Sequence, residues 1–89
     1  MKILVMCRPS AGVDPTIQIA PLTGQEIGAL LKLRDTGLLV NAYSPNGPGA
    51  VLFFDCLRED VESALLTLPL VREQLVDTEI IELIPFPGL

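Results

Sequence analysis

The 89-residue chain contains no histidine and no tryptophan, and its only aromatic residues are one tyrosine and three phenylalanines. Without histidine, acid–base chemistry near neutral pH must use carboxylates, tyrosine, lysine or cysteine. A Cys–His nucleophile pair is excluded for the same reason. The few aromatic side chains also leave little surface on which nucleic-acid bases can stack.

Basic residues are scarce as well, with six against eleven acidic residues and a formal net charge of −5. They are scattered along the chain, whereas a phosphate-binding surface needs clustered Lys and Arg. We therefore expect no nucleic-acid partner. No apolar run approaches the roughly 18 residues that span a bilayer, so we expect no membrane association.

The sequence has only two cysteines, Cys7 and Cys56, which do not form the disulfide framework of a small secreted domain. Cys7 has no second cysteine three residues later, where Ser10 stands, so copper or zinc binding is not expected. Met1 and Lys2 lead directly into a short apolar run, without the pattern of a signal peptide. These observations favour a cytoplasmic protein with reduced thiols.

The length allows one domain, residues 1–89, because chains divide into several cores only at larger sizes. Apolar residues make up 49% of the sequence, which is a large share for a small domain. A domain of this size gains stability by covering apolar surface against a second subunit. We therefore expect a homodimer or a higher homo-oligomer.

Apolar runs and turn residues alternate in an order that predicts β-α-β-β-α-β. The predicted elements are a strand over 2–8, a loop to about 21, a helix from 23 to about 36, hairpin strands over 38–44 and 50–56, a helix over 58–68 and a strand over 76–84. This order is typical of the α+β, ferredoxin-like fold, a four-stranded antiparallel sheet with two helices on one face.

The first helix begins with Thr23-Gly24-Gln25-Glu26, which matches a capping box. In that interpretation Thr23 is the N-cap and Glu26 reaches back to its backbone, so Glu26 receives a structural role and no chemistry. An apolar stripe at helical spacing follows, and Gly37 suits the left-handed position after the helix.

The hairpin predicts which side chains face away from the helices. If Ser44 lies opposite Ala50, one face carries Leu38, Val40, Ala42, Leu52, Phe54 and Cys56, and the other carries Leu39, Asn41, Tyr43, Val51, Phe53 and Asp55. The first set should lie under the helices. The second set is too apolar for a solvated sheet, so we expect a second sheet or a ligand to cover it, as in a dimeric barrel.

Several short motifs occur in a familiar order: Gly37 opens the second strand, Phe54-Asp55 end the third, and Leu65-Leu66 precede Leu68-Pro69-Leu70. Over roughly residues 26–85 the chain resembles the muconolactone isomerase branch of the dimeric α+β barrel proteins. The resemblance implies an oligomer of barrel dimers and a small apolar pocket without cofactor or metal. It also implies a hydrophobic, ring-shaped or carboxylated small substrate. The Trp, Arg and His typical of that family near the second strand are absent here.

Two residues are candidates for catalysis. Asp55, on the predicted open face beside Phe53, is the best carboxylate for proton transfer, although it also suits a helix-capping position. Tyr43 is placed to donate a hydrogen bond to a developing enolate oxygen, or it fills the barrel with its hydroxyl bonded to backbone.

Two further residues are candidates for substrate binding. Asn41 either orients a substrate carbonyl or bonds within the barrel, and Arg8 either pairs with a substrate carboxylate or forms a surface ion pair. The favoured function is a cofactor-independent isomerase or cyclase. The alternatives are a non-catalytic ligand-binding or assembly protein and a cofactor-free monooxygenase-like barrel.

Overall fold

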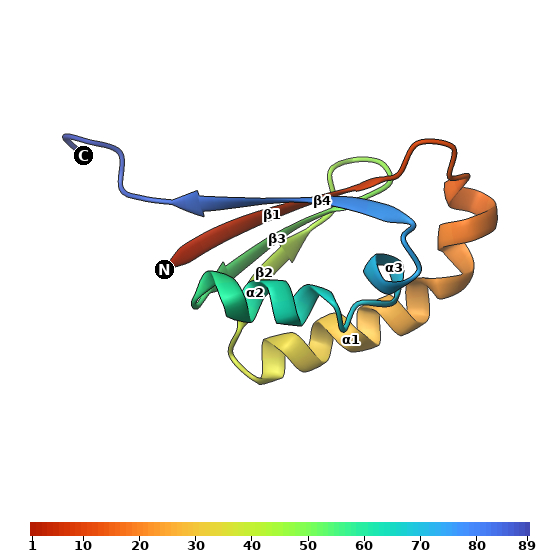
Figure 1. The fold of residues 1–89 in the computed structure, drawn as a ribbon, viewed down its shortest axis with the longest axis horizontal. Helices are drawn as coiled ribbons and strands as arrows, with labels where there is room; N and C mark the ends of the chain where they lie inside the picture. Colours follow the sequence, from red (N-terminus) through yellow and green to blue (C-terminus); the bar gives the residue numbers. More distant parts are fainter.

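The computed structural model describes all 89 residues and shows a four-stranded antiparallel sheet with the helices on one face (Figure 1). In chain order the elements are β1 (Lys2–Pro9), η1 (Pro15–Ile19), η2 (Ala20–Leu22), α1 (Thr23–Asp35), β2 (Leu39–Tyr43), β3 (Ala50–Asp55), α2 (Arg58–Leu65), α3 (Pro69–Arg72) and β4 (Val76–Leu83). The strand order is β2-β3-β1-β4, and each neighbouring pair is antiparallel. The predicted βαββαβ fold is confirmed.

The first strand, β1, lies at the centre of the sheet, as its apolar run predicts. Ile3, Val5 and Cys7 point toward the helices and are buried. Leu4 and Met6 point to the opposite, open face and are only partly buried, so a single chain covers just one face of this strand. The open face is therefore left uncovered, and it is available for contact with another molecule.

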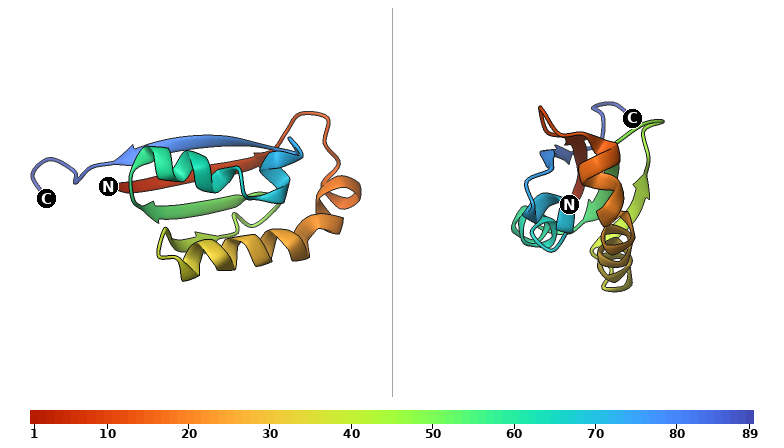
Figure 2. Two further views of the ribbon diagram at one scale, coloured as in Figure 1. Left: turned by 60° about the horizontal axis from the view of Figure 1, so that its bottom comes forward. Right: turned by 90° about the vertical axis from the view of Figure 1, so that its right-hand side faces the viewer.

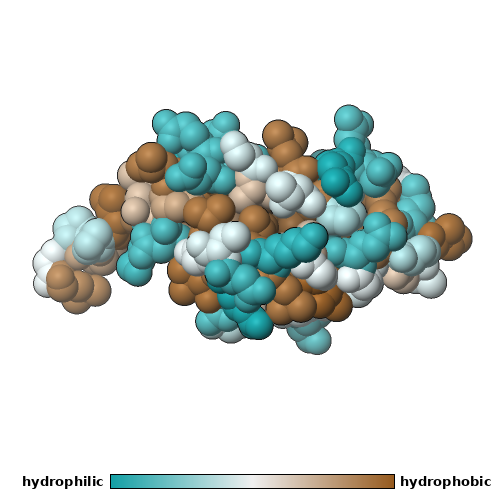
Figure 3. Space-filling model, turned by 90° about the horizontal axis from the view of Figure 1, so that it is seen from below, coloured by the Kyte–Doolittle hydropathy of each residue, from teal (hydrophilic) through white to brown (hydrophobic).

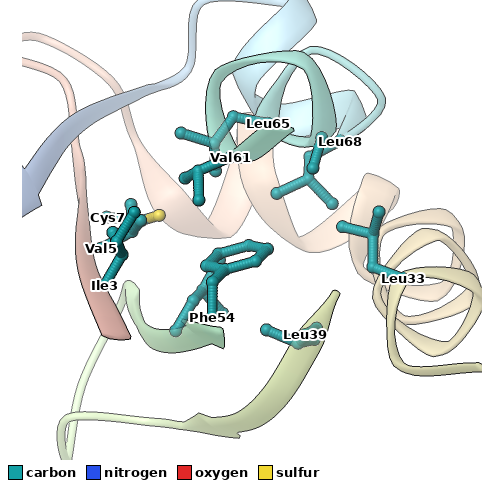
Figure 4. Packing of buried hydrophobic residues seen from close by; sticks show 11 residues of the cluster. Ile3, Val5, Cys7, Leu33, Leu39, Phe54, Val61, Leu65 and Leu68 are labelled. Atoms are coloured by element: carbon teal, nitrogen blue, oxygen red, sulfur yellow. The ribbon is translucent and has the colours of Figure 1, made fainter. Parts of the chain in front are cut away.

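The hydrophobic core lies between the sheet and the helices (Figure 4). In that view Phe54 extends from β3 toward Val61 and Leu65 of α2, with Leu33 of α1 on the far side. Each fully buried side chain of this size stabilises the fold by roughly 1.5–3 kcal/mol. The core therefore fixes β1, β3 and α2 firmly relative to one another.

The hairpin register is correct over most of its length, because Ala42 lies opposite Leu52 and Tyr43 opposite Val51. A β-bulge between Leu39 and Asn41 changes the start of β2. The prediction for Leu39 and Val40 is therefore wrong: Leu39 is 4% exposed in the core, while Val40 is 56% exposed. A bulge inserts one extra residue on one strand, which moves the residues beyond it to the other face.

The segment before α1 is more regular than predicted. In place of an irregular loop as far as residue 21, η1 and η2 form helical turns that continue into α1. The Asp14 carboxylate accepts hydrogen bonds from the backbone N–H groups of Thr16 and Ile17. Pro15 occupies the first helical position, where its missing N–H costs nothing, so this proline starts a helix and does not prevent one.

The predicted second helix, 58–68, is shorter than expected, and an unpredicted short helix follows it. Helix α2 ends at Leu65, and Leu68 adopts an extended conformation before Pro69 begins the short helix α3. Leu68 is fully buried, so its side chain anchors the corner formed by Leu68-Pro69-Leu70 in the hydrophobic core. Beyond β4 the last residues extend away from the body of the molecule, at the left of Figure 1. No helix has the length and apolar character needed to cross a membrane.

Candidate functional site

A pocket of about 410 Å³ lies between α1 and the sheet, close to the turn of the β2–β3 hairpin. We call it the helix-side pocket. Ile27 and Leu30 of α1 form one wall, while Ala42 and Ala50 of the hairpin strands form the other. Glu26 is the single charged residue among those that line it. The pocket is therefore apolar, with one carboxyl group set into it.

The pocket exists because α1 is only partly packed on the sheet. Figure 2 shows this helix lying along the β2 side of the molecule, and Leu33 is its one buried residue. Of the predicted apolar stripe, Ile27 and Leu31 remain 51% and 43% exposed. Figure 3, which views the helix-covered side, accordingly shows apolar groups between the polar ones. Part of the stripe thus lines a pocket or faces solvent.

Glu26 does not form the predicted capping box. The N-cap position is Leu22, no side chain caps the helix, and the Thr23 N–H already donates to the Ala20 carbonyl of the preceding turn. The chain is helical before α1 begins, so its first turn needs no carboxylate. Instead, Glu26 Oε1 accepts a hydrogen bond of 3.1 Å from the backbone N–H of Leu70 in α3.

The surroundings of Glu26 change its acidity. Burial raises the pKa of this carboxyl above its ordinary value, although the Leu70 N–H and the positive charge of Arg72 act in the opposite direction. Burial disfavours the charged form of a carboxyl and so makes the carboxylate a stronger base. A carboxyl with a raised pKa in an apolar pocket is a typical acid–base group.

Cys7 lies on the sheet side of the same pocket. Burial, and secondarily the negative charge of Glu26, raises the pKa of its thiol to about 11. The thiolate is the nucleophilic form of cysteine, so this residue stays neutral and unreactive near pH 7. It contributes a small apolar surface to the pocket.

Gly49 closes the end of the pocket where the hairpin turn approaches β1. Its φ angle is +116°, which L side chains rarely adopt. A Cβ atom at this position would overlap the carbonyl oxygen of Cys7. Only glycine allows the turn to lie this close to the central strand.

The open face carries a second, shallower depression of about 610 Å³, which we call the sheet-face hollow. It brings together three of the four predicted site residues, namely Asn41, Tyr43 and Asp55. Asn41 Nδ2 donates a hydrogen bond of 2.8 Å to the Tyr43 hydroxyl oxygen, and the Tyr43 ring packs edge-on against Phe53 with centroids 5.8 Å apart. The hydroxyl therefore accepts from Asn41 and keeps its own proton available for a ligand.

Asp55 is exposed and lies between two positive charges. Its Oδ1 is 3.3 Å from the ammonium nitrogen of Met1, and its Oδ2 is 3.6 Å from Lys2 Nζ. The hydrogen bond from the Met1 ammonium, followed by the charge of Lys2, lowers the pKa of the Asp55 carboxyl. A lowered pKa makes the carboxylate a weaker base, which is the opposite of the environment of Glu26.

Arg8 lies apart from the other three predicted residues. It is at the far end of β1 from Lys2 and Asp55, opposite Asp77 of β4. Its Nη1 is 4.0 Å from Glu79 Oε1, and both side chains are largely exposed. No three His, Cys, Asp or Glu side chains are grouped closely enough to hold a metal ion.

No protein-family model and no curated protein sequence matches the chain. Among solved structures it is similar to 5-chloro-2-hydroxyhydroquinone dehydrochlorinase (TftG) from Burkholderia phenoliruptrix AC1100, in complex with 2,5-dihydroxybenzoquinone. The TM-score is 0.72 over 94% of each chain, at 14% sequence identity. At that identity the similarity shows the fold alone, a four-stranded antiparallel sheet with helices on one face. The narrower muconolactone isomerase resemblance stays a prediction.

Proposed function

We propose that the protein is a cofactor-independent isomerase or cyclase that acts on a hydrophobic small molecule in the helix-side pocket, with Glu26 as the general acid–base. One observation carries this proposal: a half-buried carboxyl with a raised pKa is the single charge in an apolar pocket. The muconolactone isomerase-like resemblance of the sequence favours the same class of reaction.

The proposed chemistry needs only one proton-transfer group. The Glu26 carboxylate takes a proton from a substrate carbon next to a carbonyl group, and the resulting carboxylic acid returns it at another carbon. The atoms and electrons of the substrate are conserved, so the reaction requires no oxidant or reductant. A pKa raised toward the working pH lets the same group act first as a base and then as an acid.

The size of the pocket supports a substrate of one ring. Its volume of about 410 Å³ falls in the lower part of the range of 300–1,000 Å³ that is typical of small-molecule sites. TftG, which shares the fold, is a dehydrochlorinase whose structure holds a quinone of one ring. The pocket volume suits a ligand of similar dimensions.

The first prediction concerns Glu26→Gln, which keeps the side-chain volume and the acceptor for Leu70 but removes the titratable group. On a substrate identified by screening ring-sized ketones and lactones, we expect kcat/KM to fall by about 100-fold or more. Glu59→Gln is the matched control, because Glu59 is exposed in the first turn of α2 and does not line the pocket. Full activity of Glu26→Gln would contradict the proposal.

A second candidate site is the sheet-face hollow, in which Asp55 and Tyr43 would be catalytic and Asn41 would bind substrate. Arg8, the other predicted substrate-binding residue, lies at the far end of β1 and does not line this hollow. The hydrogen bond between Asn41 and Tyr43 favours it, because it leaves the tyrosine proton free for a developing oxyanion. The same assay separates the two sites. Loss of turnover in Asp55→Asn together with full activity in Glu26→Gln would assign the chemistry to the hollow.

A non-catalytic role in binding a small ligand is the alternative from another functional class. In that case the helix-side pocket binds its ligand and releases it unchanged. Glu26→Gln then alters the affinity for the ligand, and no turnover is detected in either protein. A monooxygenase-like reaction on an aromatic ring would instead consume oxygen, which an oxygen electrode measures directly.

We also propose that the protein is a cytoplasmic homodimer in which the open faces of two sheets pack together. Leu4, Phe53 and Ile81 lie side by side across three strands of this face. Charged residues lie at its two ends, with Lys2 and Asp55 at one and Arg8 and Glu79 at the other. An apolar centre with charged ends suits a second copy of the same surface.

A further inference from the structure

The helix-side pocket is lined by one acidic side chain, Glu26, and by no basic one. Its other ionisable lining residues are Cys7, whose thiol is neutral, and Tyr43. No Lys or Arg lines the pocket. Arg72 of α3 attracts the Glu26 carboxylate but lies outside the pocket wall. A second anion placed inside would therefore be repelled by Glu26 at close range.

The Glu26 carboxylate also has unused hydrogen-bonding capacity. Oε1 accepts from Leu70, and no protein group donates to Oε2. A carboxylate in apolar surroundings is stabilised strongly by each donor that it gains, because charge-assisted hydrogen bonds are the stronger kind. The pocket thus offers an acceptor to whatever ligand enters it.

The walls of the pocket are suited to a flat molecule. Ala42 and Ala50 present small side chains on adjacent strands, and Ile27 and Leu30 face them from α1. Ala42 lies opposite Leu52, so Ala50 is diagonal to it on the same face of the sheet, and these two small side chains leave space that larger residues would fill. A planar ring fits such a slot between a helix and a sheet.

We propose that the helix-side pocket takes an uncharged, ring-sized molecule with a hydroxyl group that donates to Glu26, and that it excludes carboxylates. This inference rests on the function proposed above for the same pocket and narrows its substrate class. It departs from the carboxylated substrate that the resemblance of the sequence allows. Two observations lead to it: the Glu26 carboxylate with its free acceptor oxygen, and the apolar slot around it.

The test uses probes that share one ring and differ in charge or in a donor. The affinities of 4-hydroxybenzamide, 4-hydroxybenzoate and 4-methoxybenzamide are measured at pH 7.5 by NMR titration of the isotope-labelled protein. The amide signals of Ala42, Ala50 and Leu70 report on the pocket. We expect 4-hydroxybenzoate to bind at least about tenfold more weakly than the amide, because of repulsion between like charges. The methoxy compound should bind about fivefold more weakly or worse, since it keeps the amide N–H groups but lacks the hydroxyl donor.

Replacement of Glu26 provides the second arm. In Glu26→Gln the preference for 4-hydroxybenzamide over 4-hydroxybenzoate should fall to within about twofold, whereas Glu59→Gln should retain it. If the Glu26 variant does not fold, the unmodified protein still gives a decisive measurement with a cationic probe. The cation 4-hydroxybenzylamine, which Glu26 attracts, should bind more tightly than 4-hydroxybenzoate.

Three results would overturn the proposal: equal or tighter binding of the benzoate, failure of the neutral probes to shift the pocket amides, or weaker binding of the cation than of the benzoate. Failure of the proposed catalysis looks different. If the pocket discriminates among the probes but no turnover is found, the proposed ligand class would be supported and the proposed catalysis contradicted. If turnover of a carboxylated substrate depends on Glu26, the proposed catalysis would be supported and the proposed substrate class would be wrong.

Discussion

At the scale of single residues, two carboxyl groups show how surroundings assign roles. Asp55 lies exposed at the end of β3 between two positive charges, and its pKa is lowered. Glu26 is half-buried among apolar groups, and its pKa is raised. The sequence places Asp55 correctly at the end of a strand beside Phe53. It gives no indication that Glu26 is the carboxyl with the stronger basicity.

The raised pKa of Glu26 predicts an unusual effect of pH on stability. A carboxyl whose pKa is higher in the folded state favours folding most when it is protonated, and this contribution disappears as the pH rises through the folded pKa. We therefore expect Glu26→Gln to be more stable than the unmodified protein at pH 7, by less than about 1 kcal/mol because the group is only half-buried. Near pH 4 the two should be equally stable.

Urea unfolding at both pH values measures this difference. Loss of stability in Glu26→Gln at pH 7 would mean that the charged carboxylate supports the fold, for example through the Leu70 hydrogen bond. Glu59→Gln again serves as the control, and its stability relative to the unmodified protein should change little between the two pH values.

At the scale of elements, the hydrophobic patterns predict the strands and the overall order well. The five residues of β2 and the six of β3 fall inside their predicted ranges, and the register from Ala42 to the turn is correct. The bulge near Val40 could not be predicted, because a local alternation of apolar residues does not show where a strand gains an extra residue.

The role of Glu26 was hidden for a different reason. The sequence Thr23-Gly24-Gln25-Glu26 matches a capping box, and this local pattern alone accounted for Glu26. Its actual partner, the Leu70 N–H, is 44 residues away. That contact depends on how α3 packs beside α1, which no short-range signal reveals. The pocket could likewise not be predicted, because it arises from incomplete packing of α1.

The hairpin turn gives a prediction at this scale. Gly49→Ala should destabilise the protein by about 2 kcal/mol or more, because the new Cβ both requires an unfavourable φ and overlaps the Cys7 carbonyl. Gly12→Ala separates the two causes, since Gly12 has a φ of +80° but no neighbour within 4 Å of an added Cβ.

Thermal unfolding of both variants checks the difference. We expect the Gly49 variant to lose clearly more stability than the Gly12 variant, and its pocket to bind the neutral probe more weakly because the turn has moved. Equal losses would mean that backbone strain alone explains the effect and that the close approach to β1 is easily relieved.

At the scale of the whole molecule, the open face of the sheet is the largest structural feature that a single chain leaves incomplete. Ile81→Glu introduces a charge on this face beside Leu4 and should shift the protein from dimer to monomer at micromolar concentration. Leu66→Glu is the control, because Leu66 is 64% exposed in the segment after α2 and lies off the sheet.

Sedimentation velocity of the two variants and the unmodified protein distinguishes the outcomes. A monomeric unmodified protein, or an Ile81 variant that remains dimeric, would contradict association through the open faces. Circular dichroism should show the same secondary structure in all three proteins, so that a change in mass reflects the interface and not unfolding.

The hydrogen bond from Leu70 to Glu26 has a practical consequence for observing the pocket. The chemical shift of an amide proton depends on the charge of the group that accepts it. The Leu70 signal in a proton–nitrogen spectrum will therefore move as Glu26 gains or loses its proton. This single resonance serves as an internal indicator, by which the ionisation of the carboxyl can be followed before any substrate is known.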